Sequence, residues 1–388
     1  MFNSYIPEDV IYEFILKLDI VEAINLLISN TELSELARTP RLLNDLANEH
    51  GLPYSKSLVK LVDYSLMSPT KLLIIASDEG DLRVVTGIVN IVSVTDKLAS
   101  DYNTSLERAV ENGHLDIANI LIDAGARDLF LVLSNASAAG YIDIVGKLIK
   151  TNSYTLQEYN TELASAAAGN HLNVVDMLIG VGANDYDNAL VAAAQYGNLD
   201  IVNRLADGVT NYDKALLAAA GHGHRNVVEM LITNGIRDYN RALIAAARHG
   251  HLGIVDILIT TGARDYDDAM IAAAGNGHLG VVNKLLKVGA ISYDRALIYA
   301  TENGHLDIVD TLIVAGAEDY DAALMEAASN GHIGIVKLLI KAGAEEYDWA
   351  LVEAIEGGHQ DVADILTEAG ARDYEDIIES QEDVPDWM

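Results

Sequence analysis

The chain has 388 residues, half of them hydrophobic, and a formal net charge of −33 at pH 7 from 58 Asp and Glu against 25 Lys and Arg. Such acidity repels phosphate backbones, so we expect no nucleic-acid partner. Cysteine is absent, which excludes disulfides, thiolate metal sites and a cysteine nucleophile. The acidity itself favours solubility, with the attraction of a basic partner as the alternative.

The first residues do not resemble a secretory signal. They read MFNSYIPEDVIYEF, with acidic side chains where a signal peptide has a basic region. No apolar run approaches the roughly 18 residues typical of a membrane-spanning helix. We therefore expect a soluble, intracellular and cytoplasmic protein without a membrane partner.

Residues 1–66 contain no repeat and predict a small segment of short helices. Pro7 suits a first helical turn, and the acidic residues after it suit the helix dipole. Apolar side chains then recur at helical spacing along one stripe. The stripe consists of Ile6, Val10, Phe14 and Leu18, with Ile11 and Ile15 beside it.

This segment resembles the F-box, a short helical motif that docks onto the adaptor subunit of cullin–RING ubiquitin ligases. The matching residues are the run IPEDVI from Ile6, then Phe14-Ile15, Leu18-Asp19 and Pro40-Arg41-Leu42. The usual opening of the family is Leu-Pro, where this chain has Ile-Pro. A helical cap that shields the first repeat is the alternative. The resemblance implies adaptor binding by Ile6, Pro7, Val10, Ile11, Phe14, Ile15 and Leu18.

Residues 67–373 are organised in repeats, which are clearest around YDDAMIAAAGNGHLGVVNKLLKVGA, Tyr266 to Ala290. Tyrosines open successive copies at one interval of 26 residues and then six of 27, a period that indicates a repeat array. Alignment of the Gly-His step extends the array to about eleven units. The predicted units begin at Pro69, Tyr102, Leu129, Tyr159, Tyr186, Tyr212, Tyr239, Tyr266, Tyr293, Tyr320 and Tyr347.

Each copy predicts two short helices. Alanines at i, i+3 and i+4 give the first helix a small buried face, and an apolar stripe that includes Leu285 and Leu286 marks the second. Gly277 separates the helices and Gly289 ends the second. One hairpin cannot bury both faces alone, so neighbours must stack. The sequence therefore predicts an all-α solenoid of helical hairpins.

The repeated Ala-Ala, Gly-His, Val-Val, Leu-Leu and Gly-Ala pairs resemble the ankyrin repeat. Two departures are the Asp-Xaa-Ala-Leu start, in place of Thr-Pro-Leu-His, and the 27-residue period, in place of 33. The shorter period implies units without the β-hairpin finger of the family. Ankyrin arrays joined to an F-box-like segment are familiar in large DNA viruses, so the resemblance implies a viral protein that acts in the host cytoplasm.

Specificity is expected at the variable positions before each Gly-His step, where the first helix of the family faces the concave side. A locally basic centre and one tryptophan add the Arg and aromatic side chains that are common at binding hot spots. Ordinary solvated positions are the alternative for half or more of this set. The predicted partner-binding residues are Gln195, Tyr196, His222, Arg225, Arg241, Arg248, His249, Asn276, Glu302, Asn303 and Trp349.

One histidine per unit forms a ladder that does not converge on a metal ion. We expect each ring to bond backbone groups in its own turn, with four clustered imidazoles near His222 and His249 as the alternative. The tyrosines are expected to pack between units, and the aspartates beside them to cap helices. The ladder comprises His114, His171, His224, His251, His278, His305, His332 and His359.

Residues 374–388 are acidic and predict a polar C-terminal cap with a frayed tail. The resemblances imply a non-enzymatic protein-protein interaction module, without cofactor, metal or catalytic residues. In this interpretation the chain is the substrate-recognition subunit of a cullin–RING (SCF-type) ligase: its N-terminus binds the adaptor and its array binds a target protein. The alternative is a scaffold that sequesters its partner.

Overall fold

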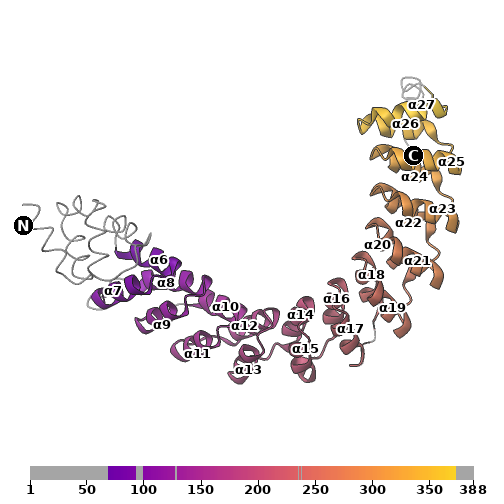
Figure 1. Ribbon diagram of the computed structural model, residues 1–388. Coiled ribbons are helices and arrows are strands. Elements are labelled where there is room, and N and C mark those ends of the chain that lie inside the picture. The colour runs from indigo at the N-terminus through magenta and orange to yellow at the C-terminus, as the bar shows by residue number, and fades with distance from the viewer. Residues whose placement is uncertain (1–68, 93–98, 127–128, 235, 237, 373–388) are drawn as a thin grey trace, which may run out of the picture. The chain divides into compact units, whose positions relative to one another are not determined.

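The computed structural model describes residues 69–92, 99–126, 129–234, 236 and 238–372 (Figure 1). Within these ranges the chain forms 22 α-helices and one 3₁₀ helix, and it forms no β-strand there. The all-α prediction is therefore confirmed. The predicted N-terminal segment, with all of its proposed adaptor-binding residues, and the acidic C-terminal segment lie outside the described residues.

The helices alternate along the chain between the first and the second helix of a hairpin. The first helices are α6 (Pro69–Glu79), α8 (Ala99–Glu111), α10 (Phe130–Ala139), α12 (Leu156–Ala168), α14 (Tyr186–Tyr196), α16 (Asp213–Gly221), α18 (Asn240–Arg248), α20 (Tyr266–Gly275), α22 (Tyr293–Glu302), α24 (Tyr320–Ser329) and α26 (Tyr347–Glu356). The second helices are α7 (Leu82–Val92), α9 (Leu115–Asp123), α11 (Ile142–Thr151), α13 (Leu172–Gly180), α15 (Leu199–Leu205), followed by the 3₁₀ helix Ala206–Gly208, α17 (Arg225–Ile232), α19 (Leu252–Thr261), α21 (Leu279–Val288), α23 (Leu306–Ala315), α25 (Ile333–Ala342) and α27 (Gln360–Ala369).

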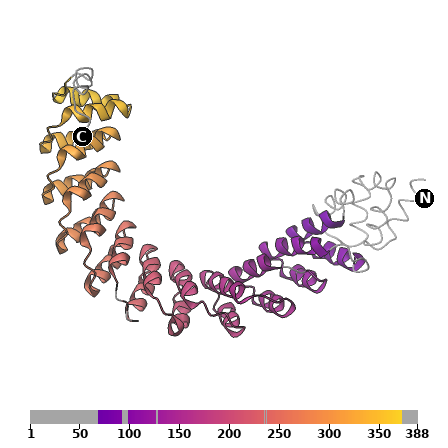
Figure 2. The same ribbon diagram turned by 180° about the vertical axis from the view of Figure 1, so that it is seen from behind.

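The chain divides into two compact units, Met1–Glu162 and Leu163–Met388, with the boundary inside α12. Within each of these two compact units, first helices lie beside first helices and second helices beside second helices, so the hairpins build two layers (Figure 1, Figure 2). Successive first helices pack more closely than successive second helices. The alanines on their facing sides permit this approach, because a methyl side chain is small enough for neighbouring backbones to lie close together.

The buried positions of one hairpin show how the core is made. In α20, Ala269, Met270, Ala273 and Ala274 are fully buried, as the repeat pattern predicts. In α21, Val281, Val282 and Leu285 are buried, and each such side chain contributes about 1.5 to 3 kcal/mol through burial. The same positions recur in the neighbouring units, so the core continues along the array.

Leu286 departs from the predicted core. The sequence pattern placed it in the buried stripe of α21, but the structure leaves it half-buried. Its neighbour Leu285 points fully into the core. At about 100° per residue, Val281, Leu285 and Val282 share one arc of the helix, and Leu286 lies about 40° beyond the edge of that arc.

The connections between hairpins are short. Gly277 and Gly289 adopt φ of +79° and +104°, the left-handed region that favours glycine, and they end α20 and α21. Residues 289–292 alone link α21 to α22, which leaves no space for a β-hairpin. The absence of the finger at this connection follows from the 27-residue period. In the described part of the chain, no helix is long and apolar enough to cross a membrane.

Candidate protein-binding surface

Histidine side chains join each unit to the one before it. His224 Nε2 lies 2.8 Å from the backbone oxygen of Gln195, near the end of the preceding first helix. A carbonyl oxygen only accepts, so Nε2 carries the hydrogen. We predicted that each ring bonds backbone groups in its own turn. This is wrong, because the acceptor lies in the preceding unit. The same contact joins His114 to Asp78, His251 to Gly221, His278 to Arg248, His305 to Gly275 and His332 to Glu302, at 2.9 to 3.2 Å.

Seven of the eight ladder histidines also lie against a glycine of the preceding unit. A Cβ built on Gly250 would lie 2.6 Å from His278 Nδ1, and the φ of Gly250 is +75°. Two independent reasons therefore favour glycine at this position: the left-handed backbone and the ring that fills the space of a side chain. The repeated Gly-His pair thus encodes an interface between units.

Side-chain oxygens near the start of the first helices, mostly of aspartates, bind the loop that leads to the next unit. Asp267 Oδ1 accepts hydrogen bonds from the backbone N–H groups of Ile291 and Ser292, at 2.6 and 2.9 Å. The sequence suggested Asp265 or Asp267 as a helix cap. Asp265 is the N-cap residue of α20, but its side chain makes no capping bond. The Asp267 contact recurs at Asp187, Asn240, Asp294, Asp321 and Asp348.

Neighbouring donors lower the pKa of two of these carboxylates, Asp187 and Asp348. The Thr210 hydroxyl, which lies 2.7 Å from Asp187 Oδ2, is the main cause that lowers the pKa of Asp187. The backbone N–H of Arg372 is the main cause that lowers the pKa of Asp348. The tyrosines are half-buried beside these contacts, and the Tyr186 ring lies where a Cβ on Gly208 would be. That contact lies within one unit; the predicted packing between units is seen at Tyr212, whose hydroxyl donates a hydrogen bond to the Ala206 carbonyl of the preceding unit.

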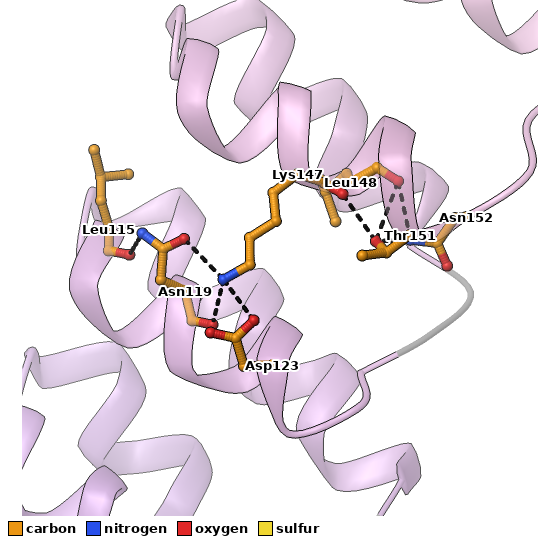
Figure 3. A network of polar contacts seen from close by, with 7 residues as sticks. All are labelled: Leu115, Asn119, Asp123, Lys147, Leu148, Thr151 and Asn152. Atoms are coloured by element: carbon orange, nitrogen blue, oxygen red, sulfur yellow. Dashed lines mark hydrogen bonds and ion pairs between the residues drawn. The ribbon is translucent and has the colours of Figure 1, made fainter.

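The second-helix layer uses its charges to tie units together. Figure 3 shows Lys147 of α11 reaching back to α9, with Nζ 2.7 Å from Asp123 Oδ1 and 3.1 Å from the Asn119 carbonyl. In the other compact unit, Lys284 and Asp256 are 2.6 Å apart, joining α21 to α19. Arg204 and Asp176 make a similar pair between α15 and α13, at 2.7 Å.

The first helices keep a different surface, which we call the first-helix face. It consists of the third, seventh, tenth and eleventh residues of each unit, counted from the tyrosine, which share one side of a helix. In α18 these residues are Arg241, Ala245, Arg248 and the C-cap His249. All except the half-buried Ala245 are exposed. The inter-unit bonds described above place these residues side by side from one unit to the next.

The structure puts nearly all of the predicted partner-binding residues on this face. Tyr196 is 60% exposed at the end of α14, and Trp349 is 48% exposed in the first turn of α26. Arg225 is the exception, because it begins α17 in the second-helix layer and pairs with Glu229 at 2.8 Å. The remaining predicted residues on the face are Gln195, His222, Arg241, Arg248, His249, Asn276, Glu302 and Asn303.

The centre of the first-helix face carries a group that we call the basic cluster. Burial is the largest cause that lowers the pKa of His249, and the nearby charges of His251, His222, Arg248 and His278 lower it further. Among the described residues no carboxylate pairs with Arg241 or Arg248. The basic cluster comprises Lys214, His222, Arg241, Arg248 and His249.

Sequence reasoning missed two members of the face. Lys214 and Tyr299 occupy its third and seventh positions in their units, and Tyr299 is 44% exposed. A Cβ on Gly275 would lie 3.4 Å from Tyr299 Cβ, so the aromatic ring extends from the contact between α20 and α22. The signal was present in the sequence, because four of the preceding units have alanine where Tyr299 stands.

The clustered imidazoles do not form a metal site. His222 and His224 have their ring centroids 6.5 Å apart, and those of His249 and His251 are 6.3 Å apart. Across the described ranges, no group of three or more His, Cys, Asp or Glu side chains is arranged to hold a metal ion.

Stacked helical hairpins with a continuous polar face define a repeat solenoid of the protein-binding class. The sequence pattern of ankyrin repeats in three copies matches residues 133–214, 206–268 and 297–376, more than half of the chain. The chain therefore belongs to the ankyrin-repeat family. A search of curated proteins found no match. The F-box resemblance and a viral origin stay predictions, because the family match does not bear on them.

Proposed function

We propose that the chain is a non-enzymatic binding module that holds a protein partner on its first-helix face. The exposed arginine and aromatic side chains of this face carry the proposal. Arg241 and Arg248 are exposed there and have no carboxylate partner in the described part of the chain, whereas Arg295 on the same face lies 3.9 Å from Asp268. Stacked units are pre-organised, so binding costs little ordering.

Aromatic side chains support the same face. Tyr196, Tyr299 and Trp349 are exposed there, although large apolar groups are usually buried. Aromatic and Arg side chains contribute strongly at protein interfaces when a partner covers them. The first-helix face offers both kinds, spread over several consecutive units.

Partner capture from a cell extract tests this proposal. The full chain is immobilised beside a variant with Tyr196→Ala and Tyr299→Ala, and a control with Val314→Ala. Val314 is 82% exposed on α23, in the second-helix layer. We expect the control to retain the proteins captured by the original chain and the face variant to lose them. Equal capture by all three would contradict the proposal.

The finer proposal concerns the N-terminal segment. We propose that residues 1–66 bind a ubiquitin-ligase adaptor, so that the chain recruits its partner as a substrate-recognition subunit. The supporting observation is the F-box-like run from Ile6 to Ile11, together with Phe14 and Leu18. The second candidate is a scaffold that sequesters its partner, in which the same segment serves only as a cap.

A pull-down with the purified adaptor separates these two roles. The full chain and a variant with Pro7→Ala and Phe14→Asp are compared, and partner capture by the array is the control for folding. Retention of the adaptor by the original chain alone would support the ligase role. Failure of both to retain it, with partner capture intact, would leave the scaffold.

A further inference from the structure

The charge balance at the centre of the array differs from that of the whole chain. Residues 212–265 contain six Lys and Arg and five Asp and Glu, whereas the chain contains 25 and 58. This stretch is therefore close to neutral before its four histidines are counted. A nearly neutral stretch in a chain of net charge −33 is a distinct electrostatic region.

Three of the five acidic residues of this stretch make contacts away from the first-helix face. Glu229 pairs with Arg225, and Asp256 pairs with Lys284, both in the second-helix layer. Asp238 accepts a hydrogen bond from the backbone N–H of Asn240, at 3.0 Å. The cations of the basic cluster lie on the first-helix face, and the carboxylate at the third position of the next unit, Asp268 of α20, lies 3.9 Å from Arg295.

The basic cluster spans the contact between two first helices. A Cβ on Gly221 would lie 3.8 Å from the His249 ring and 3.7 Å from Ala245 Cβ, so the ends of α16 and α18 are in contact. The charge of His222 acts on His249 across this contact. One extended segment of a partner can therefore reach cations from both units.

One imidazole of the cluster is already oriented. His222 Nδ1 lies 2.9 Å from the Ala218 carbonyl, so Nδ1 carries the hydrogen and Nε2 remains available. When the ring is protonated, Nε2 becomes a second donor. Guanidinium groups such as those of Arg241 and Arg248 favour bidentate contacts with carboxylates.

We infer that the basic cluster binds an acidic segment of the partner protein. This inference rests on the proposed function of the first-helix face. Charges on remote units are screened beyond a Debye length of about 8 Å at physiological salt, so the local cations decide which segment docks. The flanking Tyr196 and Tyr299 add apolar contacts, which favours acidic segments that also carry aromatic side chains.

Fluorescence anisotropy with defined probes tests the inference on the full chain. The probe is a labelled 12-residue peptide in which Glu alternates with Ala and Tyr, and the matched peptides carry Gln or Lys in place of every Glu. We expect the Glu peptide to bind at least tenfold more tightly than the Gln peptide, and to weaken as NaCl rises from 50 to 300 mM.

Matched variants locate the binding. Arg241→Glu with Arg248→Glu should weaken binding of the Glu peptide at least tenfold. Lys337→Glu with Lys341→Glu changes the net charge equally on the exposed side of α25 and should leave it unchanged. Circular dichroism confirms that each variant is folded. Equal weakening by both pairs would overturn the inference, because only the total charge would then matter.

Other outcomes would also overturn the inference of an acidic ligand, without deciding whether the proposed function is correct. Equal or tighter binding of the Gln or Lys peptide, or of a labelled single-stranded oligonucleotide with equal negative charge, would exclude an acidic protein segment as the preferred ligand. Absence of binding by every probe would exclude it as well. The proposed function is judged separately, by whether Tyr196→Ala with Tyr299→Ala abolishes partner capture.

Discussion

His278 donates a hydrogen bond from Nε2 to the backbone carbonyl of Arg248, over 2.9 Å. The donor belongs to one hairpin and the acceptor to the hairpin before it. The repeated histidine therefore fixes the spacing of the units, and with it the arrangement of the first-helix face.

The side chain at this position must donate to the preceding unit. Asn198 replaces histidine in one unit and donates to the Ala167 and Ala168 carbonyls, at 2.7 and 2.9 Å. We expect His278→Ala to lower the free energy of unfolding by about 1 to 2 kcal/mol, and His278→Asn to lower it by less, because asparagine can still donate a hydrogen bond. Urea denaturation followed by circular dichroism measures both. An asparagine variant no more stable than the alanine variant would contradict this role.

Two glycines in the same hairpin should respond oppositely to alanine. Gly250 has φ of +75° and faces the His278 ring, so Gly250→Ala should destabilise by at least about 2 kcal/mol. Gly253 lies inside α19, and its nearest contact for a Cβ is Arg225 at 3.8 Å. Gly253→Ala should be neutral or stabilising by up to about 1 kcal/mol. Thermal denaturation of the two variants gives the comparison, and equal losses would refute it.

The aspartate contact needs an oxygen acceptor and not a negative charge. Asn240 Oδ1 accepts from the backbone N–H groups of Arg264 and Asp265, as Asp267 does from those of the next loop. We expect Asp267→Asn to cost under about 1 kcal/mol and Asp267→Ala to cost about 1 to 2 kcal/mol. Hydrogen exchange should show faster exchange at Ile291 and Ser292 in the alanine variant only. Unchanged exchange there would count against the contact.

Glu162 gives the array a dependence on pH. It is 0% exposed at a position that most units fill with alanine, and its carboxyl oxygens have no hydrogen-bond partner among the described residues. Burial is the main cause that raises the pKa of Glu162 to about 7; the nearby Ser134 hydroxyl partly offsets this rise, and the charge of Glu158 adds to it. The folded chain thus retains a proton that the unfolded chain releases near pH 4.5.

The sign of the effect follows from that difference. The stabilising contribution of protonated Glu162 is present below about pH 4.5 and is lost as the pH rises toward 7. At pH 8 the free energy of unfolding of Glu162→Ala should therefore exceed that of the original chain by about 1 to 3 kcal/mol, and its unfolding temperature should be higher. At pH 5 the difference should be smaller. Calorimetry at both values tests this. An equal difference at pH 5 and pH 8 would show that packing, and not titration, is responsible.

The sequence predicted the parts of the fold that depend on local periodicity. The alanines of α20, the Val-Val pair of α21 and the glycines that end both helices have the expected roles. The acceptor of His278 and the loop N–H groups that donate to Asp267 were not predicted. Both contacts join residues about 24 to 30 positions apart, so they depend on how closely the hairpins stack. The spacing within one hairpin does not determine that distance.

The sequence also predicted part of the candidate surface, namely the residues that differ from the repeat consensus at the end of each first helix. Tyr196 and Arg248 were recognised because they break the repeat consensus next to the Gly-His step. Tyr299 also breaks it, but about one turn earlier in its helix, where only the stacked arrangement reveals an exposed position. Arg225 lies near His222 in sequence, yet the turn between them carries it into the second-helix layer.

Photo-crosslinking tests the central claim most directly. A benzoylphenylalanine residue replaces Tyr299 on the first-helix face or Val314 in the second-helix layer, and the full chain is irradiated with its captured partner. We expect a covalent adduct with the partner from position 299 and none from position 314. An adduct from position 314 alone would show that the partner binds the second-helix layer, contrary to this account.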